Sequence, residues 1–415
     1  MHPLKRNLYA KALKLLELFP VVAILGPRQC GKTTFSRQLA PDWTYFDLEK
    51  PEHWEKIAYD PSYFFKEYPE HLIIDEAQQF PDLFKILRGI CDEKPGVKGR
   101  FILTGSSSPL LLANISESLA GRIAILEMGP LKANEFYQQA LSPFYQLFDP
   151  AAGLLTREGL DHLLAKQVPL SNAEIMRVFM YGGYPEPVLQ DSTFFKFWME
   201  QYRDTYINRD IVQLFPKLNR VAYRRFLEIL SQLSGTILNK NNIATAIEIS
   251  EGTVREYLKM IEGTFLWRSL PSFEQNVIKS VIKMPKGYIA DSGLQHYLLR
   301  IADQESLQMH PCLGHSFESF VIEEIHKGLK ASFITNWQGY HYRTRSGVEI
   351  DLILQGEFGV IPIEIKYGSR VQLKNLKNLE DFVALHDCPF GILINNAERM
   401  EWVRPTIVQI PVGYL

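Results

Sequence analysis

Short apolar runs recur through the first third of the chain and predict a buried parallel sheet. Such runs, bounded by polar or turn residues, are typical of strands that are covered on both faces. Segments of helical periodicity precede and separate these runs, and the first of them is residues 4–18. The predicted strands are 21–25, 44–47, 71–75 and 100–105. This alternation predicts an α/β fold with three layers and right-handed crossovers for residues 1–130.

The middle of the chain predicts two further parts. Residues 131–215 are rich in aromatic residues and helix formers, which predicts a helical region. In 216–290 an apolar helix precedes a short segment and a second helix, which Ser250 caps. Apolar residues of that second helix recur at i, i+3, i+4 and i+7: Val254, Tyr257, Leu258 and Ile261. With a strand at 264–269, this order predicts a winged-helix module.

Composition excludes several classes of protein. The chain has 415 residues, more than one core comfortably holds, which predicts several structural units. Its net charge of −2 argues against a constitutive, strongly electrostatic nucleic-acid binder and leaves a local basic patch open. No apolar run is long enough to span a membrane, and the N-terminus lacks a signal-peptide pattern. The cysteines are widely spaced, which indicates neither a zinc site nor disulfides: Cys30, Cys91, Cys312 and Cys388. We therefore expect a cytoplasmic protein without a membrane partner.

A glycine-rich loop between the first strand and the next helix fits the phosphate-binding pattern G-x-x-x-x-G-K-[ST]. Its glycines let backbone N–H groups point at a phosphate, and the following helix N-terminus adds positive potential. Lys32 is expected to reach the β- and γ-phosphates, and the Thr33 hydroxyl is expected to ligate Mg²⁺. The predicted binding residues are Gly26, Pro27, Arg28, Gln29, Cys30, Gly31, Lys32, Thr33 and Thr34. The pattern predicts binding of a nucleoside triphosphate, with residues 131–215 as a helical lid over it.

The strand at 71–75 ends in two carboxylates beside this loop. At the carboxyl edge of a parallel sheet, Asp75 is expected to hold Mg²⁺ directly or through water. Glu76 is expected to polarise the attacking water. The next strand ends in polar residues that are candidates for sensing the γ-phosphate or the water: Thr104, Ser106 and Ser107.

Basic residues suggest two further contacts. Arg122 is either an arginine finger, acting in cis or toward a neighbouring subunit, or a surface salt-bridge partner. A cluster of basic residues with few acids spans residues 203–225, across the end of the lid, and either contacts nucleic acid, forms a solvated helix face or contacts another subunit. Its members are Arg203, Arg209, Lys217, Arg220, Arg224 and Arg225.

The last part, residues 291–415, contains a second group of carboxylates. On the predicted helix 316–326, Glu318 lies within an arc of apolar residues, which calls for a partner or a metal, whereas Glu323 and Glu324 face away. Two-residue alternation over the strand 348–354 puts Glu349 and Asp351 on one face, and Val348, Ile350 and Leu352 on the other.

A second strand brings the remaining members of this group. In residues 361–366, Glu364 and Lys366 share a face. We expect Asp351 and Glu364 to bind Mg²⁺, with Glu318 converging from the helix, and Lys366 to stabilise charge or help deprotonate water. The alternative is a sheet edge with ordinary salt bridges.

These motifs together resemble a prokaryotic family of AAA+-type ATPases. The resemblance rests on the phosphate loop, Ile73–Gln78, Leu103–Ser107 and Leu119–Arg122. Members commonly carry a C-terminal domain of unknown function, which Tyr288–Leu294, Gly314–Val321, Val348–Asp351 and Glu364–Lys366 resemble. That domain in turn is similar to the PD-(D/E)XK nuclease fold, although Ile350 stands where the proline of that motif is found.

The resemblance implies ATP as the nucleotide, with ATPase roles for Lys32, Thr33, Asp75 and Glu76 and nuclease roles for Glu318, Asp351, Glu364 and Lys366. It favours an enzyme whose nucleotide state controls a Mg²⁺-dependent nuclease-like domain acting on DNA. The alternative is a switch without nuclease activity that binds DNA or a protein partner. An arginine finger acting in trans would require an oligomer.

Overall fold

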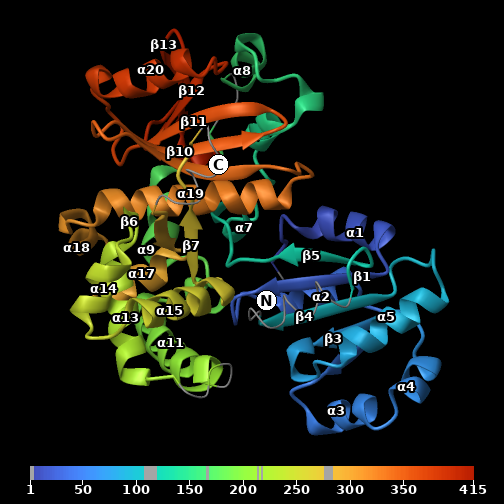
Figure 1. Ribbon diagram of the computed structural model, residues 1–415. Coiled ribbons are helices and arrows are strands. Elements are labelled where there is room, and N and C mark those ends of the chain that lie inside the picture. Colours follow the sequence, from blue (N-terminus) through green and yellow to red (C-terminus); the bar gives the residue numbers. More distant parts are fainter. Residues whose placement is uncertain (1–3, 107–118, 165–167, 213–214, 216–217, 275–283) are drawn as a thin grey trace. The chain divides into compact units, whose positions relative to one another are not determined.

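The computed structural model describes residues 4–106, 119–164, 168–212, 215, 218–274 and 284–415 (Figure 1). The chain divides into two compact units. The first comprises Met1–Leu131, Tyr184–Glu186 and Lys259–Leu266, and the remaining residues form the second. The predicted boundary after residue 130 lies next to this division. The finer partition into lid, winged-helix and nuclease-like parts stays a prediction.

The first unit contains a parallel five-stranded sheet with the order β2-β3-β4-β1-β5. Four strands match the predicted apolar runs: β1 (Val21–Gly26), β2 (Thr44–Asp47), β3 (Leu72–Asp75) and β4 (Phe101–Ser106). β5 (Ile123–Glu127) pairs with β1 at the edge of the sheet and was not predicted, although it is also a short apolar run.

Helices cover both faces of this sheet, which gives three layers. Val21, Ala23 and Leu25 of β1 belong to one apolar cluster with residues of α5. α1 and α2 also contact β1, and alternation along the strand assigns them to the opposite face. The helices of this unit are α1 (Tyr9–Leu18), α2 (Lys32–Leu39), α3 (Pro51–Ala58), α4 (Pro61–Glu67), η1 (Ala77–Gln79) and α5 (Leu83–Glu93).

The helical region predicted after residue 131 is present. Its α-helices are α7 (Ala133–Phe136), α8 (Arg157–Leu164), α9 (Asn172–Tyr181), α10 (Pro185–Val188) and α11 (Ser192–Thr205). Short helices of other types are η2 (Pro143–Phe148), η3 (Pro150–Ala152) and the π-helix η4 (Tyr206–Ile211).

The segment interpreted as a winged helix contains three helices and a small antiparallel sheet. The helices are α13 (Arg220–Leu233), α14 (Lys240–Ala246) and α15 (Glu251–Gly263). Ser250 caps α15 by accepting a hydrogen bond from the Thr253 N–H at 3.0 Å, and the predicted apolar face of α15 is buried. The sheet has the order β6-β8-β7, from β6 (Thr236–Ile237), β7 (Trp267–Leu270) and β8 (Lys286–Ile289).

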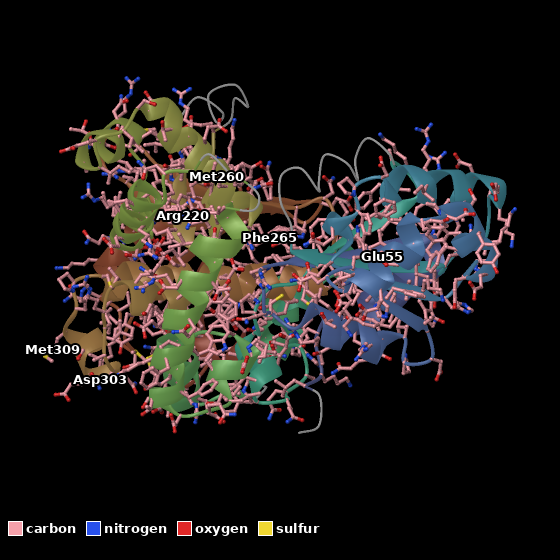
Figure 2. All side chains as sticks on the ribbon, turned by 90° about the horizontal axis from the view of Figure 1, so that it is seen from below. Glu55, Arg220, Met260, Phe265, Asp303 and Met309 are labelled. Atoms are coloured by element: carbon pink, nitrogen blue, oxygen red, sulfur yellow. The ribbon has the colours of Figure 1, made fainter. Side chains whose placement is uncertain are left out.

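The C-terminal part combines helices with a mixed six-stranded sheet of order β13-β14-β12-β11-β10-β9. Its helices are α17 (Ser292–Leu298), α18 (Gln304–Met309), α19 (Leu313–Ala331), η5 (Leu373–Leu376), α20 (Lys377–Leu385) and η6 (Val412–Tyr414). Its strands are β9 (Gln338–Arg343), β10 (Glu349–Gly356), β11 (Gly359–Ile365), β12 (Gly391–Asn395), β13 (Glu401–Arg404) and β14 (Ile407–Pro411). Asp303 caps the start of α18, whose last residue, Met309, is exposed (Figure 2).

A break in the alternation of β10 corrects the predicted face assignment. Leu352 and Leu354 pack in the cluster that contains α19, whereas Ile350 and Ile353 pack with α20. Ile350 and Leu352 therefore do not share a face. The register against β9 shifts between Ile350 and Ile353, and such a bulge re-aims the side chains beside it. Asp351 lies within this irregular stretch.

The surroundings of α19 correct a second prediction. Glu323 and Glu324 were expected to face away from the apolar arc, but both are buried. Arg268 of β7 donates to Glu323 from Nε at 2.8 Å and from Nη2 at 3.1 Å. Lys132 pairs with Glu324 at 3.2 Å. The helix is covered on nearly all sides, and cations from elsewhere in this unit, the half-buried Arg268 and the buried Lys132, balance its carboxylates.

Among the described residues, no helix has the length and apolar character needed to cross a membrane.

Candidate functional site

The phosphate loop follows the carboxyl end of β1 and leads directly into α2. Gln29 and Gly31 have φ angles of 60° and 97°, in the left-handed region. A side chain on Gly26 would place Cβ only 1.9 Å from the Met128 carbonyl oxygen, so this close approach requires glycine. The Lys32 ammonium is buried and donates to the carbonyl oxygens of Gly26 at 3.1 Å and Pro27 at 2.8 Å. The motif thus forms the compact loop that it predicts.

Arg6 supports this loop from outside the motif. Its Nη1 donates to the Cys30 carbonyl at 3.0 Å, and its Nη2 donates to the Gly129 carbonyl at 2.7 Å. The Cys30 thiol donates to the Met128 carbonyl at 3.3 Å. Motif reasoning missed Arg6, because nothing in the sequence connects an arginine before α1 with a loop that begins twenty residues later.

Asp75 is the point where the two ATPase motifs meet. Its Oδ2 accepts hydrogen bonds from the Thr33 hydroxyl at 2.8 Å and from the Tyr45 hydroxyl at 2.6 Å. Thr104 donates to Oδ1, and among the described side chains at the end of β4 it is the candidate placed against Asp75. Burial, and then the hydrogen bond to Asp75, raise the pKa of Tyr45 well above its usual value. Tyr45 is the second residue that motif reasoning missed.

The other candidates at this edge are placed less closely. The Ser106 side chain and all of Ser107 lie outside the described residues. Glu76 follows Asp75 with a left-handed backbone (φ 53°), and its carboxylate accepts a hydrogen bond from the Gln78 side chain. The left-handed residue ends β3 and turns the chain into η1. The role of Glu76 toward water stays a prediction.

Arg122 lies at the opposite end of the strands from the phosphate loop, which excludes an arginine finger in cis. It precedes β5, and Ile123 pairs with Val21 at the start of β1, whereas the phosphate loop follows the other end of β1. Its guanidinium pairs with Asp92 at 2.5 Å. The cis prediction is therefore wrong, because parallel pairing puts the starts of β1 and β5 side by side. Action across a subunit interface stays a prediction. Arg28 lies in the loop, 3.7 Å from Glu49.

The C-terminal carboxylates converge, and lysines lie between them. Lys366 Nζ is 3.2 Å from Asp351 Oδ2 and 2.6 Å from Glu364 Oε1, so both pairs confirm that these three residues meet. Asp351 Oδ2 also accepts from the Ile365 backbone N–H at 2.8 Å. Glu318 is buried and pairs with Lys286 of β8 at 2.5 Å. We refer to Glu318, Glu349, Asp351 and Glu364 as the carboxylate cluster.

The pKa values report mutual repulsion within the cluster. Burial, and then the charge of Asp351, raise the pKa of Glu364 to about 8, against the pull of Lys366. Burial and Asp351 also raise the pKa of Glu318. Burial works to lower the pKa of Lys286, but the charges of Glu318 and Asp351 outweigh it, so that this pKa rises. The cluster therefore favours cations.

The cations present are lysines, and the fit to a metal is poor in this arrangement. Within the described residues, no group of three or more histidine, cysteine, aspartate or glutamate side chains is disposed to hold a metal ion. Carboxylate oxygens are donors that Mg²⁺ prefers, but Glu318, Asp351 and Glu364 do not form such a group. Those atoms are engaged by Lys286 and Lys366. Lys286 was missed because no nuclease motif includes it.

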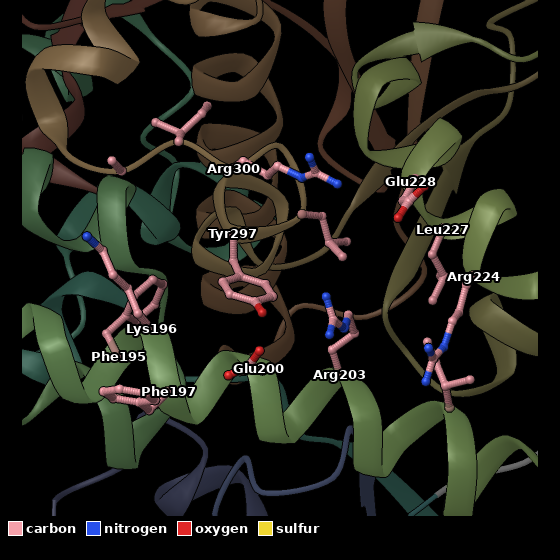
Figure 3. Close-up of a pocket in the computed structure, with 14 residues that line it drawn as sticks. Phe195, Lys196, Phe197, Glu200, Arg203, Arg224, Leu227, Glu228, Tyr297 and Arg300 are labelled. Atoms are coloured by element: carbon pink, nitrogen blue, oxygen red, sulfur yellow. The ribbon is translucent and has the colours of Figure 1, made fainter.

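The basic cluster predicted after the lid lies partly against a cavity of about 490 Å³. The cavity is in the second unit and includes Arg203, Arg224, Arg300 and Tyr297 in its lining (Figure 3). Asp204 pairs with Arg203 at 2.9 Å and lies 3.8 Å from Arg224, which offsets part of this positive charge. Lys217 and the Arg209 side chain lie outside the described residues. Contact with nucleic acid here stays a prediction.

Comparison with known proteins places the first unit in a family. Residues 18–137 match the model of an AAA domain, while 172–305 and 313–415 match two domains of unknown function, DUF8612 and DUF4143. An uncharacterized protein of Mycobacterium tuberculosis, Rv2008c, is 31% identical over 372 residues, covering 88% of this chain and 74% of its own. A Mycobacterium bovis protein, Mb2031c, gives the same values. The chain belongs to the same family as these mycobacterial proteins.

More distant similarities also span most of the chain. An uncharacterized protein of Methanocaldococcus jannaschii, MJ1544, is 24% identical over 361 residues, covering 82% of this chain and 74% of its own. Among solved structures, the Walker-type ATPase PABY2304 of Pyrococcus abyssi covers 72% of this chain and 99% of its own, at 15% identity and a TM-score of 0.42. The family match of residues 18–137 supports a P-loop ATPase domain in this chain, and the nuclease-like assignment of residues 313–415 stays a prediction.

Proposed function

We propose that this protein binds and hydrolyses ATP at the phosphate loop. We further propose that its nucleotide state controls a C-terminal nuclease-like domain that acts on DNA. One observation carries the ATPase part: the 2.8 Å hydrogen bond from Thr33 to Asp75, which joins the loop to the acidic strand end. A hydroxyl and a carboxylate in contact are the pair that holds Mg²⁺ in P-loop hydrolases.

Each residue of the site then has a distinct task. The loop N–H groups and the Lys32 ammonium bind phosphate oxygens, for which Lys32 exchanges its present carbonyl partners. Thr33 and Asp75 would hold Mg²⁺, which supplies positive charge against the transferring phosphoryl group. Glu76 orients the attacking water and accepts its proton. Tyr45 and Thr104 keep the Asp75 carboxylate oriented by donating hydrogen bonds to it.

Two variants test the ATPase proposal. Lys32→Ala should lower ATP affinity by about 100-fold or more, because the cation that meets the phosphates is lost. Glu76→Gln should keep ATP binding and lower turnover by about 100-fold, since the amide accepts no proton. Calorimetric binding and phosphate release measure the two effects. Lys85→Ala, which removes an exposed lysine on a helix surface of the same unit, provides the control. Unchanged ATP affinity in Lys32→Ala would overturn the proposal.

The nuclease part rests on the meeting of Asp351, Glu364 and Lys366. It is tested by incubating supercoiled plasmid and branched or single-stranded oligonucleotides with Mg²⁺ or Mn²⁺, with and without ATP. Cleavage should be lost in Asp351→Asn and altered in Glu76→Gln if ATP controls it. Cleavage that persists in Asp351→Asn would place the nuclease site elsewhere.

A second candidate is a nucleotide switch without nuclease activity, whose C-terminal domain binds DNA or a protein partner. The lysines that already balance the carboxylate cluster favour it, since a metal would have to displace them. Intact ATP hydrolysis with no cleavage under any of these conditions would support this candidate.

A further inference from the structure

Lys286 comes to the carboxylate cluster from outside the C-terminal sheet. It is the first residue of β8, in the small sheet that follows α15. Its side chain is only 3% exposed, and its Nζ lies 2.5 Å from Glu318 Oε1 and 3.5 Å from Glu349 Oε1. These oxygens belong to α19 and β10, respectively. One ammonium group thus bridges carboxylates of two elements, which is the geometric task of a divalent cation.

The position of Lys286 is built into the packing of the small sheet. A side chain on Gly287 would place Cβ only 2.3 Å from the Trp267 ring, so the indole packs directly on the β8 backbone. On the neighbouring strand, Arg268 binds Glu323 of α19 through two hydrogen bonds. The sheet is therefore attached to α19 at two places five residues apart, by Arg268 at Glu323 and by Lys286 at Glu318.

We propose that Lys286 is an internal cation that, together with Lys366, keeps divalent metal out of the carboxylate cluster. A buried ammonium and a divalent ion cannot share these oxygens, because like charges at such separations repel strongly in a poorly solvated site. The inference concerns which cation the cluster holds and does not depend on cleavage of nucleic acid.

A second buried lysine on the same helix provides a matched control. Lys132 pairs with Glu324 of α19 at 3.2 Å, and both side chains are almost completely buried. Lys132 touches no member of the carboxylate cluster, and burial lowers its pKa, although Glu324 works against this. Lys132→Met and Lys286→Met therefore each remove one buried ammonium group that faces α19, but only the second change removes a cation from the cluster, where Lys366 remains.

The test measures Mn²⁺ binding to the full chain without nucleotide, by calorimetry and by the shift of the melting temperature. We expect Lys286→Met to bind Mn²⁺ at least about ten-fold tighter than the wild type and to gain more thermal stability from it. Lys132→Met should bind like the wild type. Adding Asp351→Asn to Lys286→Met should remove the gain, which assigns the ion to the cluster rather than to the phosphate loop.

Two results would overturn the inference. One is tight Mn²⁺ binding at the cluster in the wild type, shown by its loss in Asp351→Asn, because Lys286 would then exclude nothing. The other is equal Mn²⁺ affinity in Lys286→Met and the wild type. If Lys286→Met alone folds poorly, Lys286→Met/Glu318→Ala tests the same point, since it removes the unbalanced buried carboxylate and leaves Asp351, Glu349 and Glu364. This double variant should still bind Mn²⁺ tighter than Glu318→Ala, and equal affinities would refute the proposal.

Discussion

The phosphate-loop site and the carboxylate cluster both place acidic side chains beside a lysine, yet the two sites balance charge differently. Asp75 accepts hydrogen bonds from the neutral hydroxyl groups of Thr33, Tyr45 and Thr104. The lysine of that site, Lys32, donates to backbone carbonyl groups. In the cluster, Lys286 and Lys366 pair directly with the carboxylates.

This difference teaches that an acidic motif does not by itself make a cation site. Hydroxyl donors orient a carboxylate and leave its negative charge in place, whereas an ammonium group at ion-pair distance cancels it. The phosphate-loop site therefore retains charge for Mg²⁺. The cluster must first lose an internal cation.

The largest effect that separates the two sites should appear in stability. Lys286→Met leaves Glu318 buried without its lysine partner and should lower the free energy of unfolding by about 3–5 kcal/mol. Lys286→Met/Glu318→Gln should recover most of this loss, because no charge then remains unbalanced at Glu318. Asp75→Asn should cost only about 1 kcal/mol, since its partners are neutral. Denaturant titration measures all three, and equal losses in Lys286→Met and Asp75→Asn would contradict the comparison.

A smaller effect concerns ATP hydrolysis. Asp75→Asn should slow hydrolysis by about 100-fold, because it removes the charge that we propose to hold Mg²⁺. Asp351→Asn should keep the rate of ATP hydrolysis within about two-fold of the wild type, because Asp351 belongs to the carboxylate cluster and not to the phosphate-loop site. Steady-state phosphate release at saturating ATP gives both values. A comparable loss in Asp351→Asn would mean that the cluster takes part in ATP hydrolysis.

The smallest effect concerns the pH dependence of stability. It arises at His296 of α17, which contacts Ser316 near the start of α19. His296 is buried between the Met180 carbonyl and the Ser316 hydroxyl, and burial lowers its pKa to about 4. The folded protein keeps this imidazole neutral, whereas the unfolded chain binds a proton below about pH 6.5. Stability should therefore be retained above pH 6.5 and fall by about 2 kcal/mol by pH 5 from this group alone. Denaturant titrations at several pH values should show this loss of unfolding free energy in the wild type and not in His296→Gln. Parallel pH profiles of the two proteins would refute the prediction.

Much of the phosphate-loop site could be predicted because its contacts follow from local order. A strand, a glycine-rich turn and a helix are contiguous in the chain, and Asp75 ends the next-but-one strand of the same parallel sheet. The predicted cis role of Arg122 was wrong because Arg122 precedes β5. It therefore lies at the start of the strands, whereas the phosphate loop follows their other end. The faces of β10 failed because alternation assumes a regular strand, and the register shift beside Asp351 breaks it.

By itself, the sequence determined the strand–loop–helix of the phosphate site, the apolar face and cap of α15, and the meeting of Asp351, Glu364 and Lys366. These features depend on neighbours in the chain or on paired strands. Only the tertiary structure decided that Arg6 supports the loop, that Tyr45 holds Asp75, and that Lys286 reaches Glu318. Each of these contacts joins segments far apart in sequence, and a buried charge is balanced by whichever partner packing brings within reach.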